Sequence, residues 1–253
     1  MTRRWAQWAT LIVTALGLGL PVLVARRFLD PADAFQQTLT VLPAPYALAI
    51  WVPIDVGFLA FAVWQVLPSQ QFNPRAATVR PWLMLTALLD ATRFWVVSRG
   101  HPGWTVPLLA AQLVLAVVMQ RAVRGGGPRP EGAEAWLRIP FSLYAGWLTF
   151  VFFLHLSTEL ARVGWDVSGL SEVTWGLIII VVSSVVGLVL RFRLDDPVYG
   201  FALGWAYFGV LIQQQGRPAV ALFAGIAAGL FLMSLFVRGE QPARQASSQS
   251  ARV

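Results

Sequence analysis

Five ionisable residues lie inside apolar stretches of this sequence, where charged side chains are rare. They are Asp55, Asp90, Arg93, His155 and Glu159. A charged group in hydrocarbon costs several kcal/mol, so such residues face the interior of a helical bundle, find partners there, and often mark a functional site. We therefore take these five residues as the first candidates for chemistry.

Asp90 and Arg93 lie in the stretch "LLDATRFWVV", in the middle of an apolar run. Residues three apart on a helix are neighbours, so the two side chains can contact each other. Two interpretations stay open for this pair. It is either a self-neutralising ion pair that locks helix packing, or part of a pocket wall in which Arg93 binds an anionic group.

Two other pairs have a spacing of four residues, which places both members on one helix face. Trp51 precedes Asp55, and His155 precedes Glu159. Arg162 follows Glu159 near the end of its run, which favours a structural ion pair for Glu159. For His155, an interhelical hydrogen bond and a contact with a ligand both stay open.

The composition places the chain among membrane proteins. Hydrophobic residues make up 57% of the 253 residues, and charged residues only 12%. The 19 basic residues are all arginines, and nearly all fall between apolar runs, which excludes a nucleic-acid-binding face. With no Cys and two His, an all-protein metal site is not expected. No motif of a soluble enzyme is present, so we expect a protein that is not an enzyme.

Eight stretches are long or apolar enough to cross a membrane as helices. The sequence thus predicts an all-α integral membrane protein with about eight transmembrane helices. The stretches are Trp5–Ala25, Tyr46–Val66, Pro81–Val97, Val106–Val123, Ile139–Leu160, Val173–Leu190, Val198–Ile212 and Ala219–Val237.

The arginines between the apolar stretches predict how the chain is oriented in the membrane. With eight helices, thirteen arginines fall on one side of the membrane and five on the other, which places both termini in the cytoplasm. The first stretch lacks a clear small-residue cleavage site, so we expect a retained helix and not a signal peptide.

Three aromatic residues lie deep in their stretches: Trp51, Trp95 and Trp147. An indole inside a bundle must pack its ring and find an acceptor for its N–H group. Flat apolar ligands bind well between such rings when a few polar groups fix their orientation. These residues therefore favour an intramembrane ligand pocket.

Three segments carry a resemblance to a known family. They are "VLPAPYALAIWVPID", "LLDATRFWVVSRGHPGW" and "RIPFSLYAGWLTFVFFLHL". Together they resemble the tryptophan-rich sensory proteins (TspO), which are related to the mitochondrial translocator proteins. The resemblance covers about the first 160 residues. It implies a five-helix bundle over residues 1–162. The three apolar stretches within 163–238 lie outside this pattern and look like the additional helices of longer family members. The tail over 239–253 has few apolar residues, so we expect it to be disordered.

The resemblance also implies a ligand site. Family members bind porphyrins, haem or sterol-like molecules in a cavity beneath the loop between the first two helices, here Arg26–Pro45. We expect ligand contacts from residues of the loop and of three helices. They are Pro43, Tyr46, Trp51, Asp55, Asp90, Arg93, Tyr144, Trp147 and His155.

This chain departs from the family pattern at four of these positions. Asp90 and Arg93 replace the Asn and Trp of the third-helix motif, Asp55 stands where Tyr is frequent, and His155 replaces an Asn. Charged groups thus occupy positions of neutral hydrogen-bonding groups. Arg93 could pair with a propionate-like carboxylate, and His155 could reach a haem iron.

The leading hypothesis is a sensor, regulator or carrier in the bacterial cytoplasmic (inner) membrane that binds tetrapyrroles or similar flat ligands. No cofactor is required under this hypothesis, although porphyrin or haem would be a ligand, and a homo-oligomer stays open. The alternatives are a proton-coupled transporter that uses Asp55, Asp90 and His155, an enzyme acting on the bound pigment, and a scaffold subunit of a membrane complex.

Overall fold

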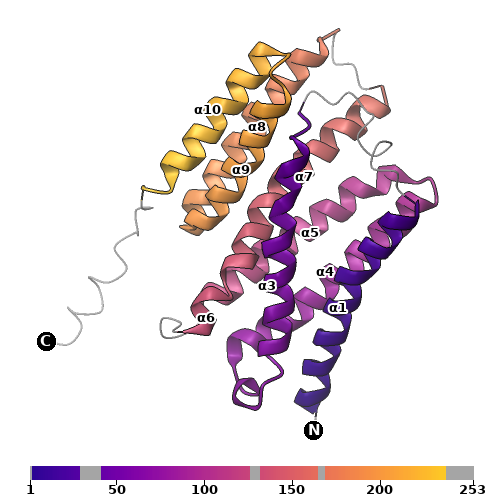
Figure 1. Ribbon diagram of the computed structural model, residues 1–253, viewed down its shortest axis with the longest axis vertical. Coiled ribbons are helices and arrows are strands. Elements are labelled where there is room, and N and C mark those ends of the chain that lie inside the picture. The colour runs from indigo at the N-terminus through magenta and orange to yellow at the C-terminus, as the bar shows by residue number, and fades with distance from the viewer. Residues whose placement is uncertain (1, 29–40, 126–131, 165–168, 238–253) are drawn as a thin grey trace, which may run out of the picture.

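The fold is helical throughout the ranges that a computed structural model describes, residues 2–28, 41–125, 132–164 and 169–237 (Figure 1). Short helical turns occur at η1 (Pro45–Ile50), η2 (Pro68–Gln70), η3 (Pro102–Trp104) and α6 (Ala133–Trp136). The long helices are α1 (Thr2–Phe28), α3 (Trp51–Trp64), α4 (Pro74–Ser98), α5 (Thr105–Arg124), α7 (Ile139–Arg162), α8 (Glu172–Leu194), α9 (Pro197–Gln213) and α10 (Pro218–Ser234). Each predicted stretch overlaps one of these long helices. The predicted tail and most of the loop that precedes Pro45 lie outside the described ranges.

Four helical segments of the described chain are long and apolar enough to cross a membrane. They are Pro45–Trp64, Pro102–Arg124, Ile139–Arg162 and Glu172–Leu194. Helix α10 is also apolar but shorter. A helix satisfies its own backbone groups, which hydrocarbon cannot do, and this explains why apolar runs of this length fold as helices. The prediction of an all-α membrane protein is confirmed at this level.

Helix α4 begins earlier than the sequence predicted, at Pro74 and not at Pro81. The Asn73 side chain caps it by accepting a hydrogen bond of 3.1 Å from the backbone N–H of Ala76, and Pro74 suits the first helical turn. The predicted stretch began just after Arg80. In the structure Arg80 is buried and its Nε donates a hydrogen bond to the Gln65 side chain, so the helix includes this charged residue.

The first five long helices close into a ring. Helix α1 packs against α3, α3 against α7, α7 against α5, α5 against α4, and α4 again against α1 (Figure 1). Helices α1 and α3 are joined near the start of α1, where Gln7 and Gln65 exchange hydrogen bonds between side chains and backbone carbonyls. From there the two helices diverge toward the end where η1 enters α3 (Figure 1).

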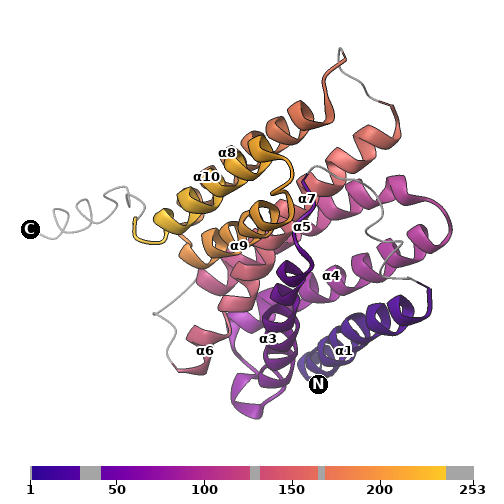
Figure 2. The ribbon, with the colours of Figure 1, turned by 45° about the horizontal axis from the view of Figure 1, so that its top comes forward.

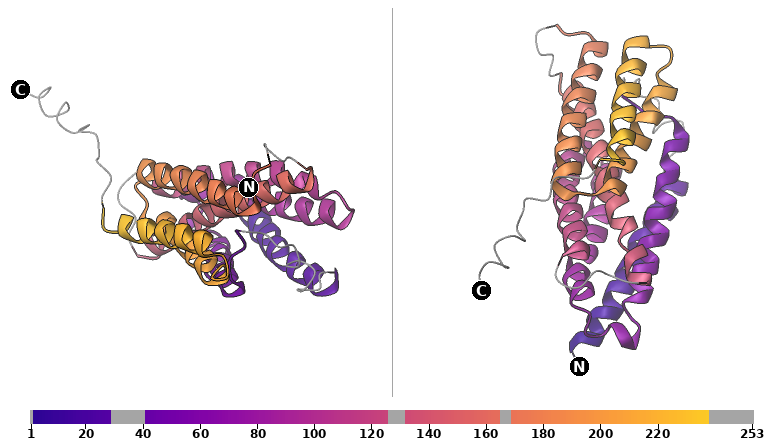
Figure 3. Two further views of the ribbon diagram at one scale, coloured as in Figure 1. Left: turned by 90° about the horizontal axis from the view of Figure 1, so that it is seen from above. Right: turned by 90° about the vertical axis from the view of Figure 1, so that its left-hand side faces the viewer.

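The last three helices pack on the outside of this ring, with α9 against α7 and α10 against both α8 and α9 (Figure 2). Viewed from above, α1 and α10 lie at opposite sides of the molecule (Figure 3). Gly146 of α7 allows α9 to approach closely, because a Cβ atom there would collide with the backbone of Tyr199. The core continues across this contact, with the Phe150 and Tyr207 rings edge to face at 5.6 Å. The division at residue 162 stays a prediction.

Candidate functional site

The Asp90–Arg93 pair forms as predicted on one face of α4. A guanidinium nitrogen of Arg93 lies 3.1 Å from a carboxylate oxygen of Asp90. The contact uses one nitrogen and one oxygen, and the buried Nε of Arg93 has no hydrogen-bond partner in the described chain. The two side chains remain 19% and 23% exposed. The pair is thus formed but is neither bidentate nor fully enclosed, which leaves Arg93 with donors for a further group.

Asp55 of α3 lies within electrostatic range of this pair. Its charge interacts with that of Asp90, and Tyr144 of α7 interacts with Asp55, Asp90 and Arg93. These residues come from α3, α4 and α7, three members of the ring, and their mutual interactions place them near the buried Tyr144. The structure thus brings together the charged residues that the sequence singled out on two separate helices.

Aromatic rings form one wall beside these charges. The Trp51 ring meets Tyr144 and Trp147 edge to face, with centroid distances of 6.2 Å and 6.4 Å. Tyr144 and Trp147 are each only 1% exposed, whereas Trp51 is half-buried. Trp51 thus offers the exposed ring of this wall, and Tyr144 and Trp147 pack behind it as a rigid support. An aromatic surface of this kind suits flat ligands.

Two polar atoms of this wall have no hydrogen-bond partner. Within the described ranges, neither the Tyr144 hydroxyl nor the Trp147 indole nitrogen makes a hydrogen bond, although both are buried. The predicted acceptor for Trp147 is therefore missing. A buried polar group without a partner costs about 1–3 kcal/mol, and such groups in a native structure call for an explanation, of which a ligand is one.

His155 lies farther along α7, half-buried, and within electrostatic range of Arg93. Glu159, one helical turn later, pairs with Arg162 through contacts of 2.8 Å and 2.5 Å. The structural interpretation of Glu159 is confirmed. Among the residues described, no group of three or more His, Asp or Glu side chains could hold a metal ion.

Pro43 and Tyr46 lie elsewhere, against α9. The backbone N–H of Ala44, next to Pro43, donates a 2.9 Å hydrogen bond to the carbonyl oxygen of Gly209. The Tyr46 ring meets Trp205 edge to face at 5.4 Å. The nine predicted residues thus form two groups, one inside the ring and one at the entry to α3.

Trp205, which our sequence reasoning did not single out, holds this entry segment. Its indole N–H donates to the Ala47 carbonyl oxygen at 2.9 Å, and the Gln214 side chain donates to the Leu42 carbonyl oxygen at 3.2 Å. Ala47 and Pro43 pack directly against Gly209. A Cβ atom at position 209 would come too close to both side chains. The two glycines of "GWAYFG" thus face different partners, Gly209 the entry segment and Gly204 the side chains of Phe231 and Leu232 on α10.

Trp95 does not belong to the aromatic wall. Its side chain is 59% exposed, and Arg99 lies over its ring at 5.7 Å. The prediction that this indole lies inside the bundle was wrong. Its position along the apolar run was central, but it lies on the outward face of α4.

A cluster of polar side chains joins three helices of the ring near the start of α1. The Gln65 side chain accepts a hydrogen bond of 2.7 Å from the Nε of Arg80 and donates one of 2.8 Å to the Gln7 carbonyl oxygen. All three residues are buried. Amides that join three helices in this way fix their arrangement, because a broken contact would leave buried groups unpaired.

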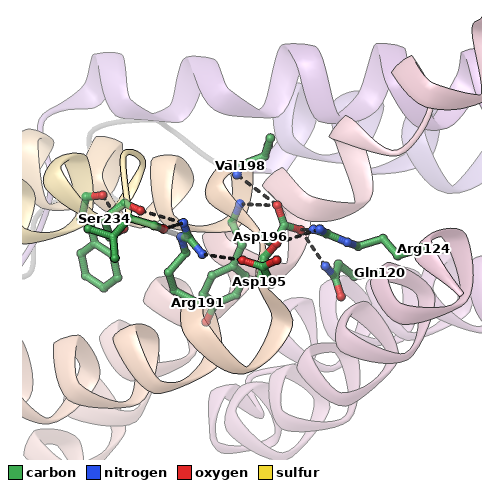
Figure 4. Close-up of polar contacts among 10 residues, drawn as sticks. Gln120, Arg124, Arg191, Asp195, Asp196, Val198 and Ser234 are labelled. Carbon is green, nitrogen blue, oxygen red and sulfur yellow. Dashed lines mark hydrogen bonds and ion pairs between the residues drawn. The ribbon is translucent and has the colours of Figure 1, made fainter. Parts of the chain in front are cut away.

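A second cluster joins the ring to the last three helices (Figure 4). Asp196, with a side chain 2% exposed, contacts Arg124 at 2.9 Å and accepts hydrogen bonds from Gln120 at 2.6 Å and Ser142 at 2.5 Å. It also caps α9 through the backbone N–H groups of Val198 and Tyr199. The sequence carried a signal for this role, since Asp before Pro is typical of a helix N-terminus.

Comparison with known proteins identifies the family. The family model of the TSPO-like proteins matches residues 7–237, which is most of the chain. The chain belongs to the TSPO-like family. No curated protein and no solved structure matches it.

The TSPO-like match extends beyond the first 160 residues on which the resemblance was recognised. It includes α8, α9 and α10. This agrees with the packing of α9 on α7 and on the entry segment, which makes the last three helices structural neighbours of the candidate site. Family membership supports a membrane protein with a sensory or binding role.

Proposed function

We propose that this TSPO-like protein binds tetrapyrroles, or similar flat amphipathic molecules, inside the ring and acts as a sensor, regulator or carrier for them. The observation that carries the proposal is the Tyr144 hydroxyl. It is buried, lacks a hydrogen-bond partner in the described chain, and lies within electrostatic range of Asp55, Asp90 and Arg93. A ligand with polar groups would satisfy it.

The shape and chemistry of the site support a ligand that is flat and has charged ends. Trp51 and Trp147 supply aromatic surface for a conjugated ring. Arg93, whose Nε lacks a hydrogen-bond partner in the described part, would bind a propionate-like carboxylate, and Asp90 would hold Arg93 in place without a ligand. In haem, the iron would find an axial ligand in His155.

For the membrane topology, we propose that all eight long helices cross the inner membrane of a bacterium. The helices alternate in direction along the chain (Figure 1). The end of the bundle at which α1 begins then carries Arg75, Arg124 and Arg138, next to the loops at the ends of their helices. An excess of arginines near loops is typical of the cytoplasmic side. Both chain termini would therefore be cytoplasmic.

The experiment that tests the binding proposal is a titration of detergent-purified protein with protoporphyrin, followed by tryptophan fluorescence and porphyrin absorbance. We expect saturable binding that weakens at least tenfold, about 1.4 kcal/mol, in Trp51→Ala, Trp147→Ala and Arg93→Ala. Trp95→Ala is the matched control, because Trp95 is exposed on the outer surface. Equal binding by all variants would refute the proposed site.

A second candidate function is proton-coupled transport. Its support is the electrostatic interaction between Asp55 and Asp90 at the level of the ring interior, since coupled carboxylates are used in proton relays. This function predicts pH-dependent flux of substrate in proteoliposomes that Asp90→Asn abolishes. Binding without flux would leave the sensory function. We propose no catalytic role for the site.

A further inference from the structure

Asp55 is a carboxylate that the described chain leaves without a counter-ion. Asp90 has Arg93 at 3.1 Å, but Asp55 makes no hydrogen bond and no ion pair in the described ranges. Its side chain is half-buried, and the charge that acts on it is the like charge of Asp90. A carboxylate in this situation gains from any cation or N–H donor that reaches it.

The charges that act on Tyr144 do not cancel. They are the carboxylates of Asp55 and Asp90 and the guanidinium of Arg93, so one carboxylate is in surplus there. The buried Arg80 lies apart from them, with Gln65 near the start of α1. Glu159 does not alter this balance, because Arg162 pairs with it. The interior thus favours a ligand with one positive charge.

The surrounding rings suit a cation as well. Trp51 lies one helical turn before Asp55 on the same face of α3, and its ring contacts those of Tyr144 and Trp147. A cation near an aromatic face is stabilised by the ring quadrupole, most strongly for Trp. The buried Tyr144 hydroxyl, which lacks a partner in the described chain, is an independent sign that a polar ligand group belongs beside Asp55.

We propose that Asp55 makes the interior of the ring a site for a flat aromatic ligand that carries a protonated nitrogen. The protonated N–H donates to the Asp55 carboxylate, the aromatic body lies against Trp51, and any carboxylate of the ligand extends toward Arg93. A tetrapyrrole with a protonated ring nitrogen meets all three conditions. The inference rests on the proposed function, since it names the charge of the ligand that this same site takes.

The test compares two flat probes of opposite charge, aminoacridine as the cation and anthracene carboxylate as the anion. Equilibrium dialysis against detergent-purified protein, with protein-free micelles as blanks, measures both affinities. We expect the wild-type protein to bind the cation about tenfold more tightly than the anion, which corresponds to the low end for a hydrogen bond to a charged group.

Three variants locate the effect. Asp55→Asn should abolish the preference for the cation, and Asp55→Glu, which keeps the charge, should retain it. Glu159→Gln removes a carboxylate from the same protein outside the site and should change nothing. Size-exclusion chromatography verifies that each variant is folded.

The outcomes separate the inference from the proposed function. If wild type binds both probes equally, or if Asp55→Asn keeps the preference, the role of Asp55 is overturned while binding of flat ligands stands. If neither probe nor protoporphyrin binds, the proposed function itself fails, and this inference fails with it.

Discussion

The indole nitrogen of Trp205 lies 2.9 Å from the carbonyl oxygen of Ala47, so a residue of α9 holds the segment that enters α3. In the same segment, the backbone N–H of Ala44 donates to the Gly209 carbonyl oxygen, and the Leu42 carbonyl oxygen accepts from the Gln214 side chain. The candidate residues Trp51 and Asp55 follow in the chain, on α3. Helix α9 therefore positions the start of the helix that carries two of the candidate residues, although α9 lies outside the ring.

Replacing Trp205 with Phe should loosen this entry segment. The substitution keeps a ring for the contact with Tyr46 but removes the N–H donor, which leaves the Ala47 carbonyl unpaired and costs about 1 kcal/mol. Hydrogen–deuterium exchange in Val41–Ile50 should become faster. Trp136→Phe, at an exposed indole, should leave this exchange unchanged. Equal exchange in both variants would contradict the role of Trp205.

Replacing Asp196 with Asn should destabilise the whole bundle. The carboxylate contacts Arg124, Gln120 and Ser142, and its removal leaves Arg124 without this charge partner at a half-buried site. Breaking a buried pair costs about 3 kcal/mol. Thermal unfolding in detergent should show a clear decrease in the midpoint.

Glu172 offers the control for this measurement. Its side chain is 74% exposed and lies 3.9 Å from the partly exposed Arg217, so Glu172→Gln should cost less than about 1 kcal/mol. If the unfolding midpoint falls equally in the two variants, the contacts of Asp196 do not hold the outer helices to the ring.

Gly146 and Gly229 should respond oppositely to alanine. A Cβ atom at Gly146 collides with the Tyr199 backbone and lies 2.8 Å from the Cβ of Ala202, so Gly146→Ala should cost about 1–3 kcal/mol. Gly229 of α10 has no described atom within 4 Å of its added Cβ, so Gly229→Ala should gain up to about 1 kcal/mol of helix propensity. Unfolding midpoints that move in the same direction would contradict the close approach of α7 and α9.

The helices of this protein could be predicted from the sequence because hydrocarbon imposes a single solution on long apolar runs. Each predicted stretch overlaps one long helix. The start of α4 was predicted too late, just after Arg80. Gln65 accepts a hydrogen bond from Arg80 inside the bundle, and no local pattern in the sequence reveals a partner fifteen positions away.

The candidate site could be predicted in part. Pairs on one helix, such as Asp90 with Arg93 and Glu159 with Arg162, follow from spacing alone. Contacts between helices do not follow from spacing, because they depend on how each helix is rotated about its axis. This explains why Trp95 was wrongly placed inside the bundle and why Trp205 was missed.

The central claim is that the interior of the ring binds a ligand beside Tyr144, and Tyr144→Phe tests it most directly. The substitution removes only a buried hydroxyl that has no partner in the described chain, so the ligand-free protein should be equally stable or more stable, by up to about 1 kcal/mol. Protoporphyrin affinity, measured on the same preparation by fluorescence titration, should fall several-fold. Loss of affinity without loss of stability is the predicted result. Unchanged affinity, or a marked loss of stability, would contradict the account.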